Sequence, residues 1–348
     1  MSEQPYHLPT NFEWYQPNLE SNDLDAIYNF LNKNYVEDAH GTFRFDYAPE
    51  FLKWALMPPD YKPEWHIVVR VKSNHNIVGF ITAIPVILNI QGKKEKAVKV
   101  NFLCVHKKLR SKRLAPLLIK EITRRVNLYG VYQAIYTSGT LLPNPIASCR
   151  YYHRSLNPKK LVYIGYASLT KNMTMARTLK LYSLPSTPLY IRPMEARDIP
   201  AVTKLLSDYL SNKDVYPEYN EDEIKHWFMP KENIVYSFVV QKQDRITDFV
   251  SFYVLPSSIL NHPKHKILKS VYGFYNVSTQ TLWKDLITDA LIMAKQLGFD
   301  VYNVLDIMDN KEFLKDCKFQ AGNGLLKYYI WSQRDVVVEP KNLGIVLF

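Results

Sequence analysis

Hydrophobic residues recur along the chain at helical and strand spacings, and they do so twice in the same order. In the first part, Leu24, Ile27 and Phe30 follow an Asn/Asp cap and predict an amphipathic helix. A short second helix carries Trp54. The further elements expected here are strands at 67–71, 78–84, 98–105 and 133–137, and a long helix at 114–128.

The second part repeats this order. A first helix near residues 198–206 and a short helix with Trp227 precede the strands. Strands are expected at 237–241, 249–255, 271–277 and 301–306, and a long helix at 282–297. Both long helices are followed by a glycine, Gly130 and Gly298, which favours a left-handed C-terminal cap.

Short sequence matches support a duplication. Glu50-Phe-Leu-Lys-Trp54 matches Glu223-Ile-Lys-His-Trp227, and Met-Pro follows shortly after each. His66-Ile-Val-Val69 matches Ser237-Phe-Val-Val240, and Pro85 and Pro256 are each expected to end the next strand. Several matches in order indicate a duplicated unit. The element order resembles that of GNAT-like acyl-CoA N-acyltransferases, so the expected fold is α/β (α+β), with two tandem pseudo-symmetric units in one compact body.

A proline-rich stretch separates the two units. Three prolines lie within residues 184–193, where they restrict the chain. We therefore expect a first unit at 1–184 and a second at 185–348. A length of 348 residues also favours two domains over one.

Composition narrows the class of protein. Hydrophobic residues make up 47% of the chain, enough for a real core, but no run of 18 apolar residues predicts a membrane span. The N-terminus has no signal-peptide pattern. Three cysteines exclude a disulfide scaffold and fit a reducing cytoplasm, and no Cys/His cluster suggests a zinc site. We expect a cytoplasmic protein without a metal.

Charge is unevenly distributed. The net charge is +11, and the first unit alone holds 25 Lys/Arg against 13 Asp/Glu. Eight basic residues and one acid lie within 107–125, where an apolar strand runs into a basic turn and then a helix with Pro116 in its first turn. Backbone N–H groups at a helix start, with basic side chains, predict a phosphate-binding turn.

Two other interpretations of the basic turn stay open at this point. A solvated basic helix face is the commoner meaning of such a run. Nucleic acid also binds basic runs, but no nucleic-acid motif surrounds this turn, so no nucleic-acid partner is expected.

Longer motifs carry a specific resemblance. The stretch from Asn101 to Val126, which begins Asn-Phe-Leu-Cys-Val-His-Lys-Lys, resembles the first signature of the glycylpeptide N-tetradecanoyltransferase (N-myristoyltransferase) family. Further similar motifs are Asn34-Tyr-Val-Glu-Asp38, Phe43-Arg-Phe-Asp-Tyr47, Cys149-Arg-Tyr-Tyr-His-Arg-Ser-Leu-Asn-Pro158, Asn172-Met-Thr-Met175, Ser251-Phe-Tyr253 and Phe274-Tyr-Asn276. The similarity covers roughly residues 10–348.

The resemblance implies an activity and a division of labour. A tetradecanoyl group would pass from myristoyl-CoA, the co-substrate, to the α-amine of an N-terminal glycine. The first unit would bind myristoyl-CoA and the second would bind much of the peptide. The resemblance further implies a monomer without stable membrane insertion, and it leaves an association with ribosomes open.

The catalytic groups follow from the same resemblance. Backbone N–H groups of Phe102 and Leu103 would hold the thioester carbonyl oxygen. The general base would be the C-terminal carboxylate of Phe348, on an apolar tail that is expected to be buried. Asn101 and Thr137 would position the glycine amine. Cys104 has no evident His–Asp partner and is not expected to act as a nucleophile.

Two binding surfaces are implied. Residues expected to contact CoA or its acyl chain are Phe12, Trp14, Phe102, Leu103, Cys104, Val105, Arg110, Ser111, Lys112, Arg113, Leu114, Ala115 and Pro116. Residues expected to contact the peptide are Tyr35, Asp38, Phe45, Tyr47, Gly139, Tyr151, His153, Ser251, Tyr275 and Asn323.

Two positions depart from the family pattern. His40 and Asn323 stand where acids are usual. Because those acids would meet basic residues of the substrate, this chain should prefer Lys or Arg in the peptide less strongly.

Two alternatives to this activity stay open at this point. One is a general acyl-CoA transferase, which the apolar C-terminus and the full-length match disfavour. The other is a non-catalytic module that binds nucleic acid or acylated proteins.

Overall fold

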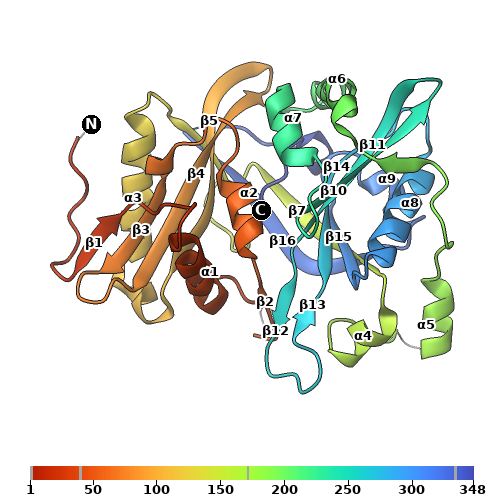
Figure 1. Cartoon of the computed structure of the whole chain (residues 1–348), viewed down its shortest axis with the longest axis horizontal. Coiled ribbons are helices and arrows are strands. Elements are labelled where there is room, and N and C mark those ends of the chain that lie inside the picture. Colours follow the sequence, from red (N-terminus) through yellow and green to blue (C-terminus); the bar gives the residue numbers. More distant parts are fainter. Residues whose placement is uncertain (1–2, 39–40, 171, 333–334) are drawn as a thin grey trace.

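One mixed sheet forms the centre of the molecule. The computed structural model describes residues 3–38, 41–170, 172–332 and 335–348. Within them, thirteen strands join in the order β1-β3-β4-β5-β6-β16-β7-β15-β14-β11-β10-β8, and β9 pairs with β4. Figure 1 shows most of the first unit toward the left of the view and the second unit toward the right, whereas the two helices at 158–163 and 175–181 lie on the right. The large sheet contains β1 (Phe12–Tyr15), β3 (His66–Val71), β4 (Ile77–Ile90), β5 (Lys93–Val105), β6 (Gln133–Ser138), β7 (Ala147–Ser155), β8 (Ile191–Pro193), β9 (Val215–Glu218), β10 (Val235–Lys242), β11 (Arg245–Val254), β14 (Ser270–Val277), β15 (Val301–Leu305) and β16 (Gln320–Trp331).

A small sheet joins the units at one edge. It orders β13 (Ile267–Leu268), β12 (Ser257–Ile259) and β2 (Phe43–Phe45), so strands from both units pair in it.

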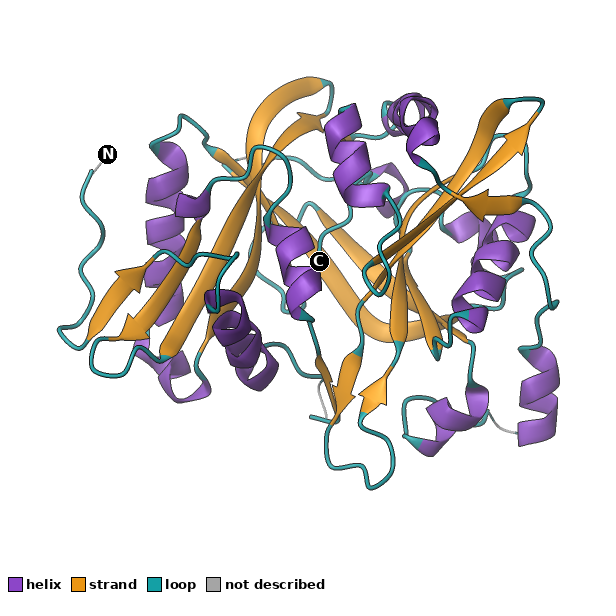
Figure 2. Cartoon of the chain, viewed as in Figure 1, coloured by secondary structure: helices purple, strands orange, loops and turns teal. Residues whose placement is uncertain are grey.

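Helices cover both faces of the sheet, as Figure 2 shows. They are α1 (Asp23–Asn34), α2 (Pro49–Leu56), α3 (Leu114–Asn127), α4 (Pro158–Tyr163), α5 (Met175–Leu181), α6 (Ile199–Leu210), α7 (Glu221–Phe228), α8 (Trp283–Gln296) and α9 (Lys311–Leu314). Successive side chains of β3 point to opposite faces of the sheet, and this explains why helices cover both faces. Ile67 and Val69 pack with Leu118 of α3, whereas Val68 packs in the cluster of α1 and α2. In the part of the chain that the structure describes, no helix is long and apolar enough to span a bilayer.

The predicted duplication is confirmed in the order of elements. Helix α3 and helix α8 each follow a long strand, and Gly130 (φ +73°) and Gly298 (φ +82°) adopt the left-handed conformation after them. The matched tryptophans of the repeat contact each other, since the rings of Trp54 and Trp227 lie 5.1 Å apart. The Trp54 indole also donates to the carbonyl of His226 at 2.9 Å. The short helices α2 and α7 are therefore packed together at the junction of the two units.

One expectation about strand ends was wrong. Pro85 does not end its strand, because β4 continues to Ile90 and pairs there with β9. Proline is tolerated because the pairing of β4 with β3 ends at Thr82 and its pairing with β9 starts at Ile87, so Pro85 lies in the gap between these two partners.

The last strand of the chain connects the units. Strand β16 pairs with β6 on one side and β7 on the other, both antiparallel. The sequence pattern did not predict β7, β9 or β16, and it gave no pairing partner for β6.

Candidate active site

A bulge in β5 holds the two amides proposed for the thioester oxygen. Phe80 pairs with Cys104 and Thr82 with Asn101, so Phe102 and Leu103 together face one residue of β4. Phe102 has φ +57°, a conformation that costs energy for a bulky side chain. Such a bulge removes backbone groups from regular pairing and re-aims them. The Phe102 N–H faces the hydroxyl of Tyr35, whose pKa is raised by burial and partly lowered by that N–H.

Asn101 and Thr137 flank a split between strands. The parallel strands β5 and β6 pair only from Ala97–Gln133 to Lys99–Ile135. Asn101 and Thr137 each lie two residues past the last pair, on opposite sides of the split. Asn101 is buried, and its carbonyl accepts a hydrogen bond from Thr82 Oγ1 at 3.0 Å. Both residues therefore lie where β5 and β6 separate, and their role in positioning the glycine amine stays a prediction.

The C-terminal tail enters this region from the second unit. Residues Leu343, Ile345, Val346 and Leu347 are buried, and Figure 1 places the C-terminus in the middle of the molecule, beside α2. The Phe348 ring lies 5.0 Å from that of Trp54 and 5.5 Å from that of Phe51. The predicted burial of the apolar tail is confirmed, although Phe348 itself remains partly exposed.

Ring contacts connect the chain end to the bulge. Phe51 lies 5.6 Å from Tyr47, and Tyr47 lies 5.0 Å from Phe102. With the Phe348–Phe51 contact, four aromatic rings span the distance between the terminal residue and the β5 bulge. Two groups that are 246 residues apart in the sequence thus share one aromatic wall.

The basic turn after β5 is exposed and tied to α1. Arg110, Ser111, Lys112 and Arg113 are all exposed, while Leu114, the first residue of α3, is buried. The turn is a 3₁₀ segment (Lys107–Lys112), and Arg113 has φ +58° at the start of α3. Ala115 is half-buried and Pro116 exposed on the first turn of that helix.

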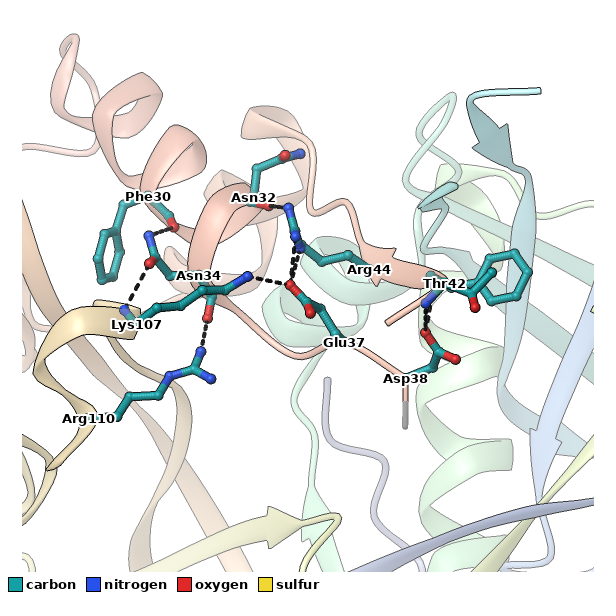
Figure 3. A network of polar contacts seen from close by, with 10 residues as sticks. Phe30, Asn32, Asn34, Glu37, Asp38, Thr42, Arg44, Lys107 and Arg110 are labelled. Carbon is teal, nitrogen blue, oxygen red and sulfur yellow. Dashed lines mark hydrogen bonds and ion pairs between the residues drawn. The ribbon is translucent and has the colours of Figure 1, made fainter. Parts of the chain in front are cut away.

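Figure 3 shows how this turn is fixed. Arg110 donates to the carbonyl of Asn34 at 2.5 Å, and the Lys107 N–H donates to Asn34 Oδ1 at 3.1 Å. Lys107 Nζ also pairs with Glu37 at 2.6 Å, and Arg44 pairs with the same carboxylate. Lys107 and Arg44 together lower the pKa of Glu37. The turn is therefore rigidly placed, while Lys112 and Arg113 make none of these contacts.

The N-terminal segment packs against α3. The Trp14 indole donates to the carbonyl of Tyr6 at 2.7 Å, and the Tyr6 N–H donates to Glu121 of α3. Phe12 pairs with Val71, and both aromatics pack partly buried against the α3 cluster. The segment thus packs on the second half of α3, at Glu121 and Arg124, and contact of Phe12 and Trp14 with CoA stays a prediction.

The structure brings the predicted peptide-contacting aromatics together. Tyr35 and Phe45 lie 5.7 and 5.9 Å from Tyr47, and Phe45 also approaches Tyr272 at 6.3 Å. Tyr151 lies 6.3 Å from Tyr272. These rings line one region between the units.

The remaining predicted peptide contacts are more dispersed. His153 is half-buried and bonds to Asn303 at 2.6 Å and Tyr166 at 3.1 Å, which fits a positioned neutral ring, since burial lowers its pKa. Asp38 accepts the N–H groups of Thr42 and Phe43 at 2.6 Å each. Gly139 and Asn323 are exposed, in the loop after β6 and in a bulge of β16. Ser251 and Tyr275 are fully buried. His40 lies outside the described residues.

Cys104 does not have the properties of a nucleophile. The side chain is buried, and burial raises the pKa of its thiol to about 12. A thiol in this state holds very little thiolate near neutral pH. Val105, next to it, is also buried. That Cys104 and Val105 line the pantetheine and acyl path stays a prediction.

Three residues of this region were missed by the sequence reasoning. Trp54 and Phe51 were assigned only to a helix, and Lys99 was not noted. Lys99 is only 6% exposed, and its Nζ lies 5.4 Å from the Trp227 ring and 5.6 Å from the Tyr219 ring. Burial lowers the pKa of Lys99 to about 8. A single lysine among the apolar residues of the strand at 98–105 was the sequence signal that could have indicated this buried amine.

Comparisons with known proteins settle the family. Residues 1–149 match the family model described as myristoyl-CoA:protein N-myristoyltransferase, N-terminal domain, and residues 163–343 match the C-terminal domain model. The chain belongs to the N-myristoyltransferase family. Within the described residues, no group of His, Cys, Asp and Glu is arranged to hold a metal ion.

Relatives of this N-myristoyltransferase family member are similar over almost its whole length. Glycylpeptide N-tetradecanoyltransferase 2 of Danio rerio is 52% identical over 99% of this chain and 71% of its own length. The Drosophila melanogaster enzyme is 52% identical over 99% of this chain and 74% of its own, and enzyme 1 of Arabidopsis thaliana is 49% identical over 100% and 81%.

Solved structures agree with the fold. The Saccharomyces cerevisiae N-myristoyltransferase with bound myristoyl-CoA superposes with a TM-score of 0.96 at 38% identity, covering 100% of this chain and 88% of that one. A GCN5-related N-acetyltransferase from Anabaena variabilis gives a TM-score of 0.51 at 9% identity, over 92% of this chain and 72% of that one. The second likeness concerns the fold alone and supports the expected GNAT-like units.

Proposed function

We propose that this chain transfers the tetradecanoyl group of myristoyl-CoA to the α-amine of an N-terminal glycine. The observation that carries the proposal is the convergence of the buried C-terminal tail and the β5 bulge on one aromatic wall. Membership of the family and the names of its relatives support the same activity.

Binding of the co-substrate would involve the first unit, residues 1–184. CoA phosphates carry negative charge, and the turn Arg110–Lys112 with Arg113 presents exposed cations beside the N-terminus of α3. The N-terminal segment with Phe12 and Trp14 would cover the bound CoA. The second unit, residues 185–348, would supply much of the peptide surface.

The chemical step needs a stabilised oxyanion and a base. The amides of Phe102 and Leu103 would donate to the thioester oxygen as the glycine nitrogen attacks the carbonyl carbon and the CoA sulfur leaves. Main-chain donors fixed by the bulge suit this role, because no reorganisation is needed when charge develops. The Tyr35 hydroxyl beside the Phe102 amide lies at the edge of the same space.

The C-terminal carboxylate of Phe348 would take the proton from the glycine ammonium. A terminal carboxyl has a pKa of about 3.5 and a terminal amine a pKa of about 8, so direct proton transfer in water is uphill by roughly 6 kcal/mol. A carboxylate removed from water becomes a stronger base. The aromatic surroundings of Phe348 favour such a change, and Asn101 and Thr137 would orient the amine.

The test is an assay of free CoA released from myristoyl-CoA and a Gly-Asn-x-x-Ser peptide. Release should depend on the peptide and should stop when its glycine amine is acetylated. A series of acyl-CoA lengths separates this activity from general acyl transfer, since the rate should be highest near fourteen carbons. Binding of CoA with no peptide-dependent release would refute the proposal.

A further inference from the structure

The second unit repeats the strand split that lies beside Asn101 in the first. Strands β14 and β15 pair in parallel only from Ser270–Val301 to Tyr272–Asn303, just as β5 and β6 pair over three positions. Three residues past the last pair, Tyr275 lies in a bulge of β14, as Phe102 lies in a bulge of β5. The duplicated fold therefore supplies a second cleft, between β14 and β15, with the layout of the first.

We propose that the second unit fills this cleft with its own side chains and uses it to hold the C-terminal tail in place for catalysis. The assignment of the tail as catalytic rests on the proposed function above. Tyr275 is then a positioning residue, because it acts on the base through the tail and not on the substrate.

The tail closes the cleft. Only about 10 Å³ of space remains there, lined by Gly273, Val304 and Val346 among others. A methyl group on Gly273 would lie 2.8 Å from Val304 Cγ1, so the strands are already as close as a glycine allows. A pantetheine arm does not fit in this space.

Tyr275 holds the tail by a hydrogen bond. The Val346 N–H donates to the Tyr275 hydroxyl at 3.2 Å, and the Tyr219 hydroxyl lies 3.2 Å from the same oxygen. Both Tyr275 and Val346 are buried, so water does not replace this bond. Val346 lies two residues before Phe348, and its position therefore restricts where the terminal carboxylate can go.

The bulge around Tyr275 is satisfied from inside the protein. Ser251 Oγ accepts the Tyr275 N–H at 3.0 Å and donates to the Tyr275 carbonyl at 2.9 Å. The backbone position that matches Phe102 is thus occupied by a serine hydroxyl. The second bulge offers no amide to an acyl group and instead keeps the Tyr275 ring directed at the tail.

The turn after β14 is filled in the same way. Asp248 Oδ1 accepts the N–H groups of Thr279, Gln280 and Thr281 at 2.6, 2.9 and 3.1 Å, directly before α8. The Thr247 and Thr281 hydroxyls donate to Oδ2. Residues 278–283 contain no Lys or Arg, unlike the basic turn before α3. In the second unit the Asp248 carboxylate therefore occupies the position before α8 that corresponds to the proposed phosphate position before α3 in the first unit.

The variant Tyr275→Phe tests the positioning role. It removes one hydrogen bond to the tail and keeps the ring, so we expect kcat to fall about fivefold or more, with KM for myristoyl-CoA within about twofold. Tyr302→Phe is the matched control, because Tyr302 is equally buried in the same unit and its hydroxyl has no hydrogen-bond partner among the described residues. The control should keep the wild-type kcat. Equal kcat for Tyr275→Phe and wild type would overturn the proposal, whereas a wild type without turnover would refute the proposed function instead.

The variant Asp248→Ala tests whether the Asp248 carboxylate occupies an anion-binding position in the turn before α8, and the test needs no activity measurement. Inorganic phosphate should raise the Tm of this variant by about 2 °C more than that of wild type, because the vacated amides can bind it. Ile287→Ala, in the helix that follows this turn and also fully buried, is the control for loss of stability without a vacated anion position. Equal phosphate shifts in all three proteins would overturn the proposal that Asp248 occupies an anion position.

Discussion

The rings of Trp54 and Phe348 lie 5.0 Å apart, so the last residue of the chain packs on a helix that begins 299 residues earlier, at Pro49. Tyr253 holds the other side of the Phe348 ring at 5.0 Å, edge to face. Aromatic contacts of this kind add about 0.5–1.5 kcal/mol each beyond burial. The chain end is therefore a packed structural element, which a catalytic terminus requires.

Removing Phe348 should abolish most of the acyl transfer while leaving myristoyl-CoA binding largely intact. A general base contributes about 10²–10⁴-fold to a rate, and the deletion moves the carboxylate away from its place. Extending the tail by several residues should have the same effect. Single-turnover rates with saturating myristoyl-CoA provide the measurement. Phe348→Leu is the control, because it keeps a terminal carboxylate on an apolar residue and should retain much more activity. An unchanged single-turnover rate after deletion would show that the carboxylate is not the base.

Replacing Arg113 by glycine should weaken myristoyl-CoA binding about fivefold or more at low salt. The variant loses a cation at the start of α3, and a charge-assisted hydrogen bond is worth about 1.5–3 kcal/mol before solvent screening. The fold should not suffer, because Arg113 has φ +58°, which glycine adopts without strain. Titration calorimetry at two salt concentrations gives the affinity and its salt dependence. Lys295→Ala, an exposed cation in the last turn of α8, should bind like wild type. Equal affinities for both variants would place the phosphates elsewhere.

The variant Asn323→Asp should raise the preference for peptides with Lys or Arg downstream of the glycine. Asn323 is exposed in a bulge of β16, so a carboxylate there stays accessible to a basic side chain. An exposed charge pair is worth about 0.2–1 kcal/mol, which corresponds to up to about fivefold in kcat/KM. Specificity constants for paired peptides with and without the basic residue are the measurement. In the wild type, a large loss on removing the basic residue would contradict the weak preference expected from His40 and Asn323.

Replacing Lys99 by methionine should stabilise the protein at pH 7, and the gain should shrink as the pH rises from about 8 toward 10.5. The native state disfavours the charged amine, because burial lowers its pKa to about 8 while the unfolded chain keeps a value near 10.5. Below pH 8 both states are protonated and the full penalty applies. Between these values the unfolded state binds the additional proton, so wild-type stability rises with pH.

Urea unfolding at pH 7 and pH 10 would measure this difference, expected to be about 1–3 kcal/mol at pH 7. Lys96→Met, an exposed lysine on the same strand, should change stability by less than about 0.5 kcal/mol at both pH values. A Lys99→Met variant less stable than wild type at pH 7 would mean that the attraction between Lys99 and Glu223 outweighs desolvation.

Local patterns in the sequence were sufficient to predict most of the helices and strands of the two units. Helix α3 was expected at 114–128 and runs over Leu114–Asn127, and β14 was expected at 271–277 and runs over Ser270–Val277. Periodicity, caps and glycines act within a few residues, so they can be recognised without the fold. The motif around Asn101 likewise indicated the family from the sequence.

The arrangement of the site was decided by contacts between distant segments. Pairing of β16 between β6 and β7, the continuation of β4 through Pro85, and the contact of Phe348 with Trp54 leave no local pattern. Ser251 and Tyr275, predicted as peptide contacts, are joined by hydrogen bonds to the backbone of β14 and to the tail, and no local pattern indicated these bonds. Most of the elements and the family follow from the sequence, because they depend on short-range spacing. Which groups meet depends on the tertiary structure, because two packed units must exclude water and satisfy their buried polar atoms.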